Sequence, residues 1–578
     1  MANMTDMEKN HLELTETNVT ESNDQHLEKL DTLQSIDIEN HQAFKGDDSD
    51  GKVEWTIKKL LASAFLAMLY TGSQVPLYFA GATLSFIAAD IGRADAIGWI
   101  PVANTLAIAA VCPFVGYLQD LFGKRYIALF GAVLLCVGCA VLGTAHNLSQ
   151  ALAGMALSGA GAGVGELTGL AGLAETVPVR LRGYSLAVLT AFVLPFCPYV
   201  LYAELFSHAS SWRWGAWISL IYNGIVGIGL LFTYFPHAHV RADGLSWQAV
   251  VKRIDFAGGA LSITGLTLLL VALQAGGYTH PWESAYVLCP LLFGIALLGG
   301  WILWEAKYAK HPMVPKELFM GQRVVALAYV VAFIGGMSFF SLLNFWPLTI
   351  SNVWDPVPVK IGLRAIPAGF ATAIGAIFWN AMLSTWPGGA REILVIAAGF
   401  LTAFGGSLAI MSPENIVATI AVGIGAAFGV GGVLVPSATI AMIAAPDALI
   451  TTCAALSLSV RAVGGAIGYS IYYNIFAGKL KVKLPALVAE YAIKAGLPLA
   501  QAELFVGTYL TAPTEVSKIP GITAEILEGA LTGSQWAYAE SLRYVWYTSI
   551  AFGICAMIAA AFIPNTKKFQ TNRVAVAL

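Results

Sequence analysis

Residues 116–125 read Gly-Tyr-Leu-Gln-Asp-Leu-Phe-Gly-Lys-Arg, and this stretch decides the interpretation of the whole chain. It lies between two apolar segments that begin near Ala96 and Tyr126. Each is long enough to cross a bilayer, which takes about 20 mostly apolar residues. The glycines allow two helices to turn tightly, and the basic pair is typical of a cytosolic membrane surface. The stretch therefore predicts a short connection between two membrane-spanning helices.

The composition extends this prediction to the rest of the chain. The 578 residues are 57% hydrophobic and only 12% charged, whereas soluble domains are about 45–50% apolar and about 25% charged. These values exclude a soluble enzyme, a disordered protein and a nucleic-acid-binding protein. Residues 1–54 differ from the rest, with 14 acidic and 4 basic residues and no apolar run. They are predicted to form a disordered acidic tail without a signal peptide.

Apolar segments of spanning length recur about fourteen times. They begin near Ile57, Ala96, Tyr126, Leu148, Tyr184, Trp214, Phe256, Ala285, Val324, Ile361, Ile393, Ile416, Thr452 and Leu542. With the acidic tail inside, the inner loops hold fifteen Lys and Arg residues and the short outer loops hold three. This bias predicts that both termini are cytosolic. The segment of about 477–540 is then a long extracellular loop, and we expect prolines such as Pro485 to break it.

An internal repeat divides the chain. Gly161 and Gly163 precede Pro178 by 17 and 15 residues, and Gly429 and Gly431 precede Pro446 by the same intervals. A second echo pairs Trp212-Arg213-Trp214, followed by Gly224, with Leu542-Arg543-Tyr544, followed by Gly553. The two echoes together predict two six-helix halves, as in many secondary transporters. The predicted division is a tail at 1–54, an N-terminal bundle at 55–236, two inserted helices with linkers at 237–322, a C-terminal bundle at 323–565, and a cytosolic tail at 566–578.

The quoted loop resembles the signature loop of the major facilitator superfamily, through Gly116, Asp120, Gly123, Lys124 and Arg125. The resemblance implies that this loop gates the cytosolic side. It also implies that Asp120 latches the inner gate by facing a helix N-terminus and an arginine.

Three further stretches, 174–183, 211–215 and 460–469, narrow the resemblance. With them the chain is similar to the fungal trichothecene efflux pump branch of the fourteen-span drug:proton antiporters, which is close to the siderophore-iron transporters. The resemblance implies an all-α polytopic membrane protein of the major facilitator fold, with 6+2+6 helices. The fifth span departs from the exporters, since it keeps Pro195 and Pro198 but lacks the neighbouring glycines.

Glu166 is the candidate for proton coupling. It lies nine residues before Glu175, and so about 13 Å into the membrane at helical rise. An ionised carboxylate at that depth is costly unless it is paired, and intramembrane acids are functional by default. The alternative is a protonated, structural glutamate.

Two polar stripes are candidates for the substrate cavity. The resemblance implies that the first and ninth spans line the cavity. Their polar residues recur every three or four positions, which places them near one helix face. Interhelical hydrogen bonding is the alternative reading of both stripes. The stripes consist of Tyr70, Ser73, Gln74 and Tyr78 in the first span, and Ser338, Ser341 and Asn344 in the ninth.

Helix packing and gating are assigned to Arg213, Arg461, Gly464, Gly465 and Gly468. Glycines let membrane helices approach closely. Arg461 has two readings: it pairs with a carboxylate or an anionic substrate group, or it extends toward the membrane surface and packs against carbonyl groups. We favour the structural reading, because Arg461 lies near the inner end of its span.

The predicted function is export of an amphiphilic small molecule, such as a toxin, secondary metabolite or drug, by proton antiport with alternating access. Proton-coupled import of ferric siderophores is the alternative. No ATP-binding loop motif is present and the nine His residues are scattered, so we predict neither an ATPase nor a membrane enzyme, and no cofactor or metal. The predicted partners are the substrate, protons and the lipid bilayer. A monomer in the cell membrane is expected, with the vacuolar membrane as the alternative location.

Overall fold

The computed structural model describes residues 55–92, 96–236, 253–277, 279–319, 323–511, 515–516 and 519–575. The predicted acidic tail 1–54 and the linker residues 237–252 lie outside these ranges. Within the described residues the regular structure is helical, and an isolated bridge between Gly276 and His280 is the single β contact. The all-α prediction is confirmed.

Six helical spans form the N-terminal half. They are α3 (Ile57–Ala82), α5 (Trp99–Phe122), α6 (Lys124–Gly143), α7 (Leu148–Glu175), α8 (Arg182–Ala191) continued by α9 (Tyr199–Ala209), and α10 (Arg213–Thr233). The short helix α4 (Leu84–Ile91) follows α3.

Two inserted helices and six more spans complete the bundle. The inserted helices are α12 (Phe256–Ala275) and α13 (Ala285–Lys307). The C-terminal half consists of α14 (Arg323–Thr349), α15 (Pro358–Thr385), α16 (Ala390–Ser407), α17 (Ile416–Ala444), α18 (Ile450–Lys494) and α20 (Ala524–Ala561).

Among the described residues, thirteen helical segments are long and apolar enough to cross a membrane. Helix α7 is not one of them, because its many glycines and its glutamate lower its hydropathy. It nevertheless contacts α3, α5 and α6, and nearly all of its residues from Ser158 onward are buried. With α7 included, the bundle has the fourteen spans that the sequence predicts.

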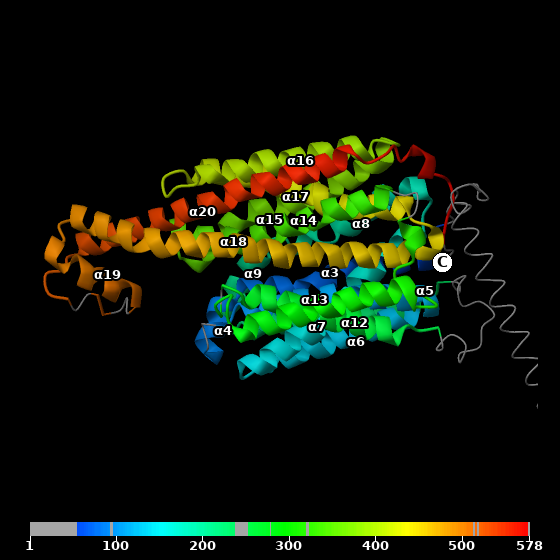
Figure 1. Ribbon diagram of the computed structural model, residues 1–578, viewed down its shortest axis with the longest axis horizontal. Coiled ribbons are helices and arrows are strands. Elements are labelled where there is room, and N and C mark those ends of the chain that lie inside the picture. Colours follow the sequence, from blue (N-terminus) through cyan, green and yellow to red (C-terminus); the bar gives the residue numbers. More distant parts are fainter. Residues whose placement is uncertain are drawn as a thin grey trace, which may run out of the picture.

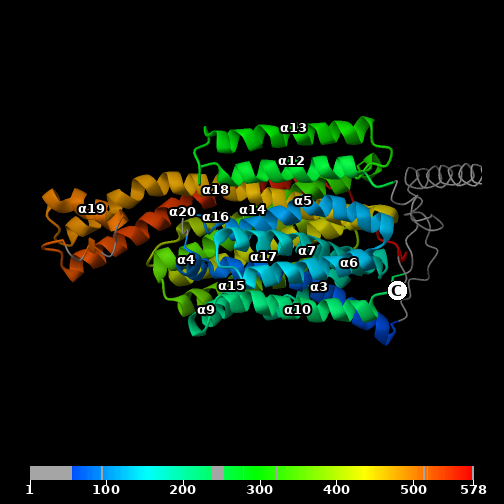
Figure 2. The ribbon, with the colours of Figure 1, turned by 90° about the horizontal axis from the view of Figure 1, so that it is seen from below.

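The main contacts between the halves are α5 with α18 and α8–α9 with α15, and α7 also contacts α18. Helices α12 and α13 lie at one edge, where α12 contacts α5 and α18 and α13 lies outside α12 (Figure 2). Figure 1 shows the C-terminus at one end of the bundle and α19 (Ala502–Thr511) beyond the other end. We call these ends the tail face, which holds residues 563–575, and the hairpin face.

The two glycine-rich helices of the internal repeat pack in equivalent ways. A Cβ at Gly161 of α7 would lie 2.4 Å from the backbone nitrogen of Leu135 in α6. A Cβ at Gly429 of α17 would lie 2.4 Å from the backbone nitrogen of Leu401 in α16. The fourth span therefore packs on the third through the same kind of backbone contact by which the twelfth packs on the eleventh.

This contact gives a stability prediction. We expect Gly429→Ala to lower the free energy of unfolding by about 1–3 kcal/mol, because the added methyl group meets backbone that has no room to move. Gly224→Ala in α10 is the matched control, since a Cβ there meets nothing within 4 Å. Thermal unfolding of the purified protein measures both variants, and equal transition temperatures would show that the close packing at Gly429 does not matter.

The segment 477–540 differs from the predicted loop. Helix α18 runs for 45 residues through Pro485, and α20 runs for 38 residues. Both extend past the bundle and enclose a small core with α19, which includes Val488, Phe505 and Ile526. The expectation that Pro485 breaks the chain is wrong: packing against α20 maintains α18 through it, and a Cβ at Gly533 of α20 would lie only 2.5 Å from the Leu487 carbonyl oxygen.

Candidate transport site

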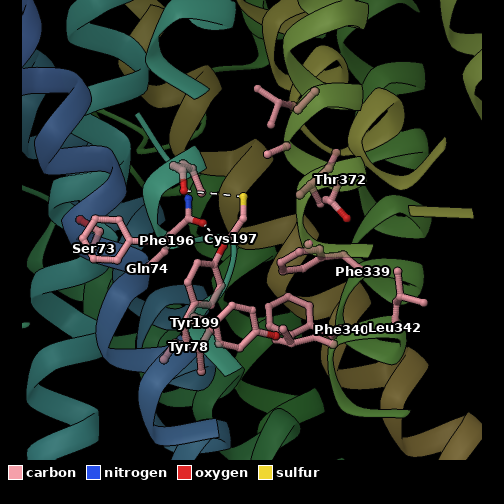
Figure 3. A pocket seen from close by; sticks show the side chains of 18 of the residues that line it. Ser73, Gln74, Tyr78, Phe196, Cys197, Tyr199, Phe339, Phe340, Leu342 and Thr372 are labelled. Carbon is pink, nitrogen blue, oxygen red and sulfur yellow. Dashed lines mark hydrogen bonds between the residues drawn. The ribbon is translucent and has the colours of Figure 1, made fainter. Parts of the chain in front are cut away.

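A cavity of about 130 Å³ lies between the two halves. Helices α3, α5, α7, α8 and α9 line it from one half, and α14, α15, α17 and α18 line it from the other. Its wall is mainly apolar and aromatic. Figure 3 shows rings from both halves around it, namely Tyr78, Phe196, Tyr199, Phe339 and Phe340. An apolar wall with a few polar groups is typical of sites for drug-sized organic molecules.

An ion pair joins the halves at this cavity. Glu166 Oε1 of α7 accepts a hydrogen bond from Arg461 Nη2 of α18, and both residues line the cavity. Glu166 is 2% exposed and Arg461 is 13% exposed. The favoured reading of Arg461, a structural side chain directed to the membrane surface, is wrong, because a buried carboxylate on the opposite half offers it a partner of opposite charge. Arg461 Nε is buried and has no hydrogen-bond partner among the described residues.

Local sequence explains where Glu166 lies. A Cβ at Gly165 would lie 2.3 Å from Ser73 Oγ, and one at Gly169 would lie 2.8 Å from Tyr70 Cβ. The two glycines therefore let α7 approach α3 on both sides of Glu166. This contact brings the acid next to the polar stripe of α3.

The polar stripe on α3 lies on the wall of the central cavity. Tyr70, Ser73, Gln74 and Tyr78 all line the cavity. The Tyr78 hydroxyl donates a hydrogen bond to Gln74 Oε1. The Tyr78 ring stacks on Tyr199, with 4.8 Å between the ring centroids. Gln74 and Tyr78 thus form a pre-ordered polar and aromatic edge of the cavity.

The polar residues of the stripe on α14 face different pockets. Ser341 is buried, donates to the Met337 carbonyl oxygen, and faces a small pocket toward α16, α17 and α20. Its assignment to the substrate cavity is wrong, because the cavity side of α14 at this level carries Phe340 and Leu343. Asn344 lines a second, outer cavity.

The glycines of α18 lie against α14. A Cβ at Gly464 would lie 2.1 Å from the Phe333 carbonyl oxygen, one at Gly465 would lie 2.1 Å from the Phe340 ring, and one at Gly468 would lie 2.7 Å from Met337 Cβ. These three positions require glycine so that the two helices can pack closely beside Arg461.

The aromatic side chains from the fifth and ninth spans were not predicted. The fifth span is interrupted at Pro195 and Pro198, where a short 3-10 turn separates α8 from α9. The interruption directs Phe196, Cys197 and Tyr199 to the cavity. The two prolines were the available signal, since proline interrupts a helix.

A second cavity of about 500 Å³ adjoins the first toward the hairpin face. The two cavities share Leu77, Tyr78 and Tyr199 among their lining residues. The second is also lined by Ser85 of α4 and by Pro356, between α14 and α15. We call this outer cavity the vestibule. The central cavity therefore continues toward the hairpin face.

Contacts between the halves occupy the tail face. Asp120 Oδ2 of α5 accepts hydrogen bonds from the backbone N–H of Thr452 at 2.9 Å and from its hydroxyl at 2.6 Å. Thr452 is in the first turn of α18, so Asp120 lies at a helix N-terminus, as the resemblance implies. The arginine that the resemblance also implies is not found beside it among the described residues, where Asp120 Oδ1 is buried without a hydrogen-bond partner. A Cβ at Gly116 would lie 2.4 Å from Ala455 Cβ, so α5 and α18 cross closely here.

The rest of the signature loop connects helices of the N-terminal half. Gly123 has a φ of 85°, a backbone conformation that favours glycine. Lys124 forms a buried ion pair with Glu175 at the end of α7. The Arg125 guanidinium lies 3.7 Å from the centroid of the Phe235 ring. These contacts hold the loop beside the contact between Asp120 and Thr452.

The C-terminal segment lies across the same face. Arg182 of α8 donates to the Met442 carbonyl oxygen at 2.7 Å and forms an ion pair with Asp447 at 3.6 Å. Asp447 also pairs with Arg573 at 2.6 Å. The backbone N–H of Val179 donates to the Arg573 carbonyl oxygen at 3.1 Å. The segment thus connects the N-terminal half to the C-terminal half.

Arg213 lies on the opposite face. It forms an ion pair with Asp90 at 2.7 Å and donates to the Ala145 carbonyl oxygen at 2.7 Å. Hydrogen bonds from the Trp212 indole and from Arg213 hold the pKa of Asp90 below its usual range. Arg213 therefore connects α10, α4 and the end of α6 within one half.

The molecule has two six-helix halves around a central cavity. The halves are in contact at the tail face, and the cavity widens toward the hairpin face. This arrangement defines a secondary transporter of the major facilitator class. Residues 54–578 match the family model described as "Fungal trichothecene efflux pump". The chain belongs to this family. It is therefore a multi-pass membrane transporter of the efflux-pump branch and not an enzyme.

Individual relatives agree with this assignment. The chain is 26% identical to the MFS-type transporter pydD of Acremonium sp, over 90% of this chain and 89% of that protein. It is 26% identical to the MFS-type efflux transporter ffsH of Aspergillus flavipes, over 78% of each chain. Among solved structures, the proton:xylose symporter XylE has a TM-score of 0.53 at 11% identity, covering 89% of this chain and 98% of that one. This last likeness shows the fold alone.

Proposed function

We propose that the protein exports an amphiphilic small molecule by proton antiport, as a monomer in the cell membrane. The observation that supports this most strongly is the ion pair between Glu166 and Arg461, which joins the two halves and lines the central cavity. A buried ion pair is broken at large cost when one partner loses its charge. Protonation of Glu166 is therefore a local event that changes how the halves hold together.

The excess of Lys and Arg makes the tail face cytosolic in this proposal. The described arrangement is then the outward-open state, with the vestibule toward the outside and Asp120 holding the inner gate. A proton from outside neutralises Glu166 and frees Arg461. The halves rock, and the central cavity opens to the cytosol.

Substrate entering from the cytosol completes the cycle. Its binding favours return of the Glu166 proton to the cytosol, after which the carboxylate pairs again with Arg461 and the outward-open state re-forms. One proton moving down 100 mV supplies about 2.3 kcal/mol. This is enough for a gradient of roughly fifty-fold for a neutral solute.

Transport into sealed inside-out vesicles with an imposed pH gradient, acid inside, tests the proposal. The panel contains a trichothecene-like sesquiterpenoid, other hydrophobic toxins and ferric siderophores. Uptake that depends on the gradient and is lost with a protonophore is expected. Failure of that uptake, together with proton-driven entry of a ferric chelate into right-side-out vesicles, would instead establish an importer.

The contacts of the C-terminal segment give a separate prediction. Deleting residues 570–578 removes the ion pair of Arg573 with Asp447 and the hydrogen bond to Val179. We expect the outward-open population to fall, because the tail face then has fewer contacts between the halves. A cysteine introduced at Thr451 reports this as faster labelling by a membrane-impermeant maleimide in inside-out vesicles. An unchanged labelling rate would show that the segment does not stabilise the inner gate.

A further inference from the structure

The vestibule contains one ionisable side chain that the proposed cycle does not use. Glu204 of α9 is 6% exposed and lines the vestibule beside Tyr199 and Val200. Among the described residues that line this cavity, it is the one carboxyl group, and no Lys, Arg or His side chain lines the cavity with it. It belongs to a different helix from Glu166 and does not line the central cavity.

Glu204 forms no ion pair in the part of the chain that the structure describes, and the basic side chain nearby is His208, one turn further along α9. The Oε2 atom of Glu204 is buried without a hydrogen-bond partner among the described residues. Two basic groups at the hairpin end are already engaged: Arg213 pairs with Asp90, and Lys360 pairs with Asp355. A buried carboxylate without a partner is costly, so a cation brought to such a group stabilises its ionised form.

The surroundings of Glu204 suit a cation with an apolar body. Aromatic rings from five helices line the same vestibule, including Tyr78 on α3, Phe340 on α14 and Tyr469 on α18. Aromatic faces attract organic cations and also cover apolar groups. The cavity of about 500 Å³ is large enough for a drug-sized molecule. A small inorganic cation would find few oxygen ligands here, since the other polar lining groups are dispersed over several helices.

We propose that the vestibule is a binding site for amphiphilic organic cations, with Glu204 as the counter-ion and the aromatic rings as the wall. This rests on the proposed function, because it names a substrate class for the same exit path. Glu204 would give the vestibule its specificity: the carboxylate attracts a cationic centre on its way out, whereas an uncharged molecule gains no such electrostatic attraction. His208 lies one turn further along α9 and is the titratable neighbour on that helix.

The test compares two probes of similar shape that differ in charge. Tetraphenylphosphonium is a permanent cation, and triphenylphosphine oxide is uncharged. Their affinities are measured calorimetrically on the full chain in nanodiscs, without any pH gradient. We expect Glu204→Gln to weaken tetraphenylphosphonium binding at least tenfold and to leave triphenylphosphine oxide within twofold. Glu204→Asp, which keeps the charge, should restore part of the affinity for the cation.

Glu503→Gln on α19 is the matched control, because it removes an exposed carboxylate outside the vestibule. It should change neither affinity. The proposal would be overturned if Glu204→Gln bound tetraphenylphosphonium as tightly as the native chain does. It would also be overturned if the substitution weakened the binding of both probes by the same factor. Because binding is measured without a gradient, this result is independent of proton-driven export. A chain that exports a neutral compound but fails this test keeps the proposed function and loses the cation site.

Discussion

Replacing Glu166 by glutamine should abolish gradient-driven accumulation, while exchange of substrate across the membrane persists. The amide cannot take up and release the proton, and it leaves Arg461 without its opposite charge. We therefore expect accumulation in acid-inside vesicles to fall to the level set by passive entry. Counterflow, in which external label exchanges with preloaded substrate, needs no proton and should remain within severalfold of the native rate.

A matched control separates charge loss at the cavity from loss of a carboxylate in general. Glu528→Gln changes an exposed residue of α20 beyond the bundle and should leave both assays unchanged. Native accumulation by Glu166→Gln would show that this glutamate is structural. Loss of counterflow as well, with normal expression and thermal stability, would mean that it binds substrate instead of coupling protons.

We expect the second large loss of transport from the substitution Asp120→Asn. In Asp120→Asn the charged acceptor of the two Thr452 hydrogen bonds is lost. Hydrogen bonds to a charged group contribute about 1.5–3 kcal/mol, and a carboxylate is also favoured at a helix N-terminus. The outward-open state should lose about tenfold or more in population relative to the inward-open state. Turnover in vesicles should slow accordingly, because return of the halves to the outward-open state becomes unfavourable.

Asp120→Glu is the informative companion, because it keeps the charge but displaces it by one methylene group. It should retain more turnover than Asp120→Asn. Normal turnover by Asp120→Asn at normal expression would remove the latch from the mechanism. Faster turnover by Asp120→Asn would also contradict the proposed role of the latch, since the contact between Asp120 and Thr452 would then slow the native cycle.

The sequence predicted those features that depend on local pattern. Apolar length predicted the spans, and the spacing of Gly161 and Gly429 predicted related helices in the two halves, whose backbone contacts are indeed equivalent. The depth of Glu166 in its helix predicted a buried acid, which is 2% exposed. Each of these follows from helix geometry within one span.

The sequence did not predict contacts between residues that lie far apart along the chain. The partner of Glu166 is Arg461, 295 residues away, and only the docking of the halves brings the two together. Ser341 shares a helical spacing with Asn344, yet Ser341 lines a small pocket toward α16, α17 and α20 and Asn344 lines the vestibule. The continuation of α18 through Pro485 likewise depends on packing against α20, which no local pattern reveals.

Coupling between Glu166 and substrate is measured most directly by counting the protons released when substrate binds. A compound accumulated in the vesicle assay is added to the purified protein in weak buffer, and the pH change is followed with an indicator dye. At a pH acidic enough to protonate Glu166 before substrate is added, we predict release of about one proton per protein, since binding of proton and substrate is reciprocally linked, and no release from Glu166→Gln. Binding without proton release by the native protein, or equal release by the variant, would contradict proton antiport through Glu166.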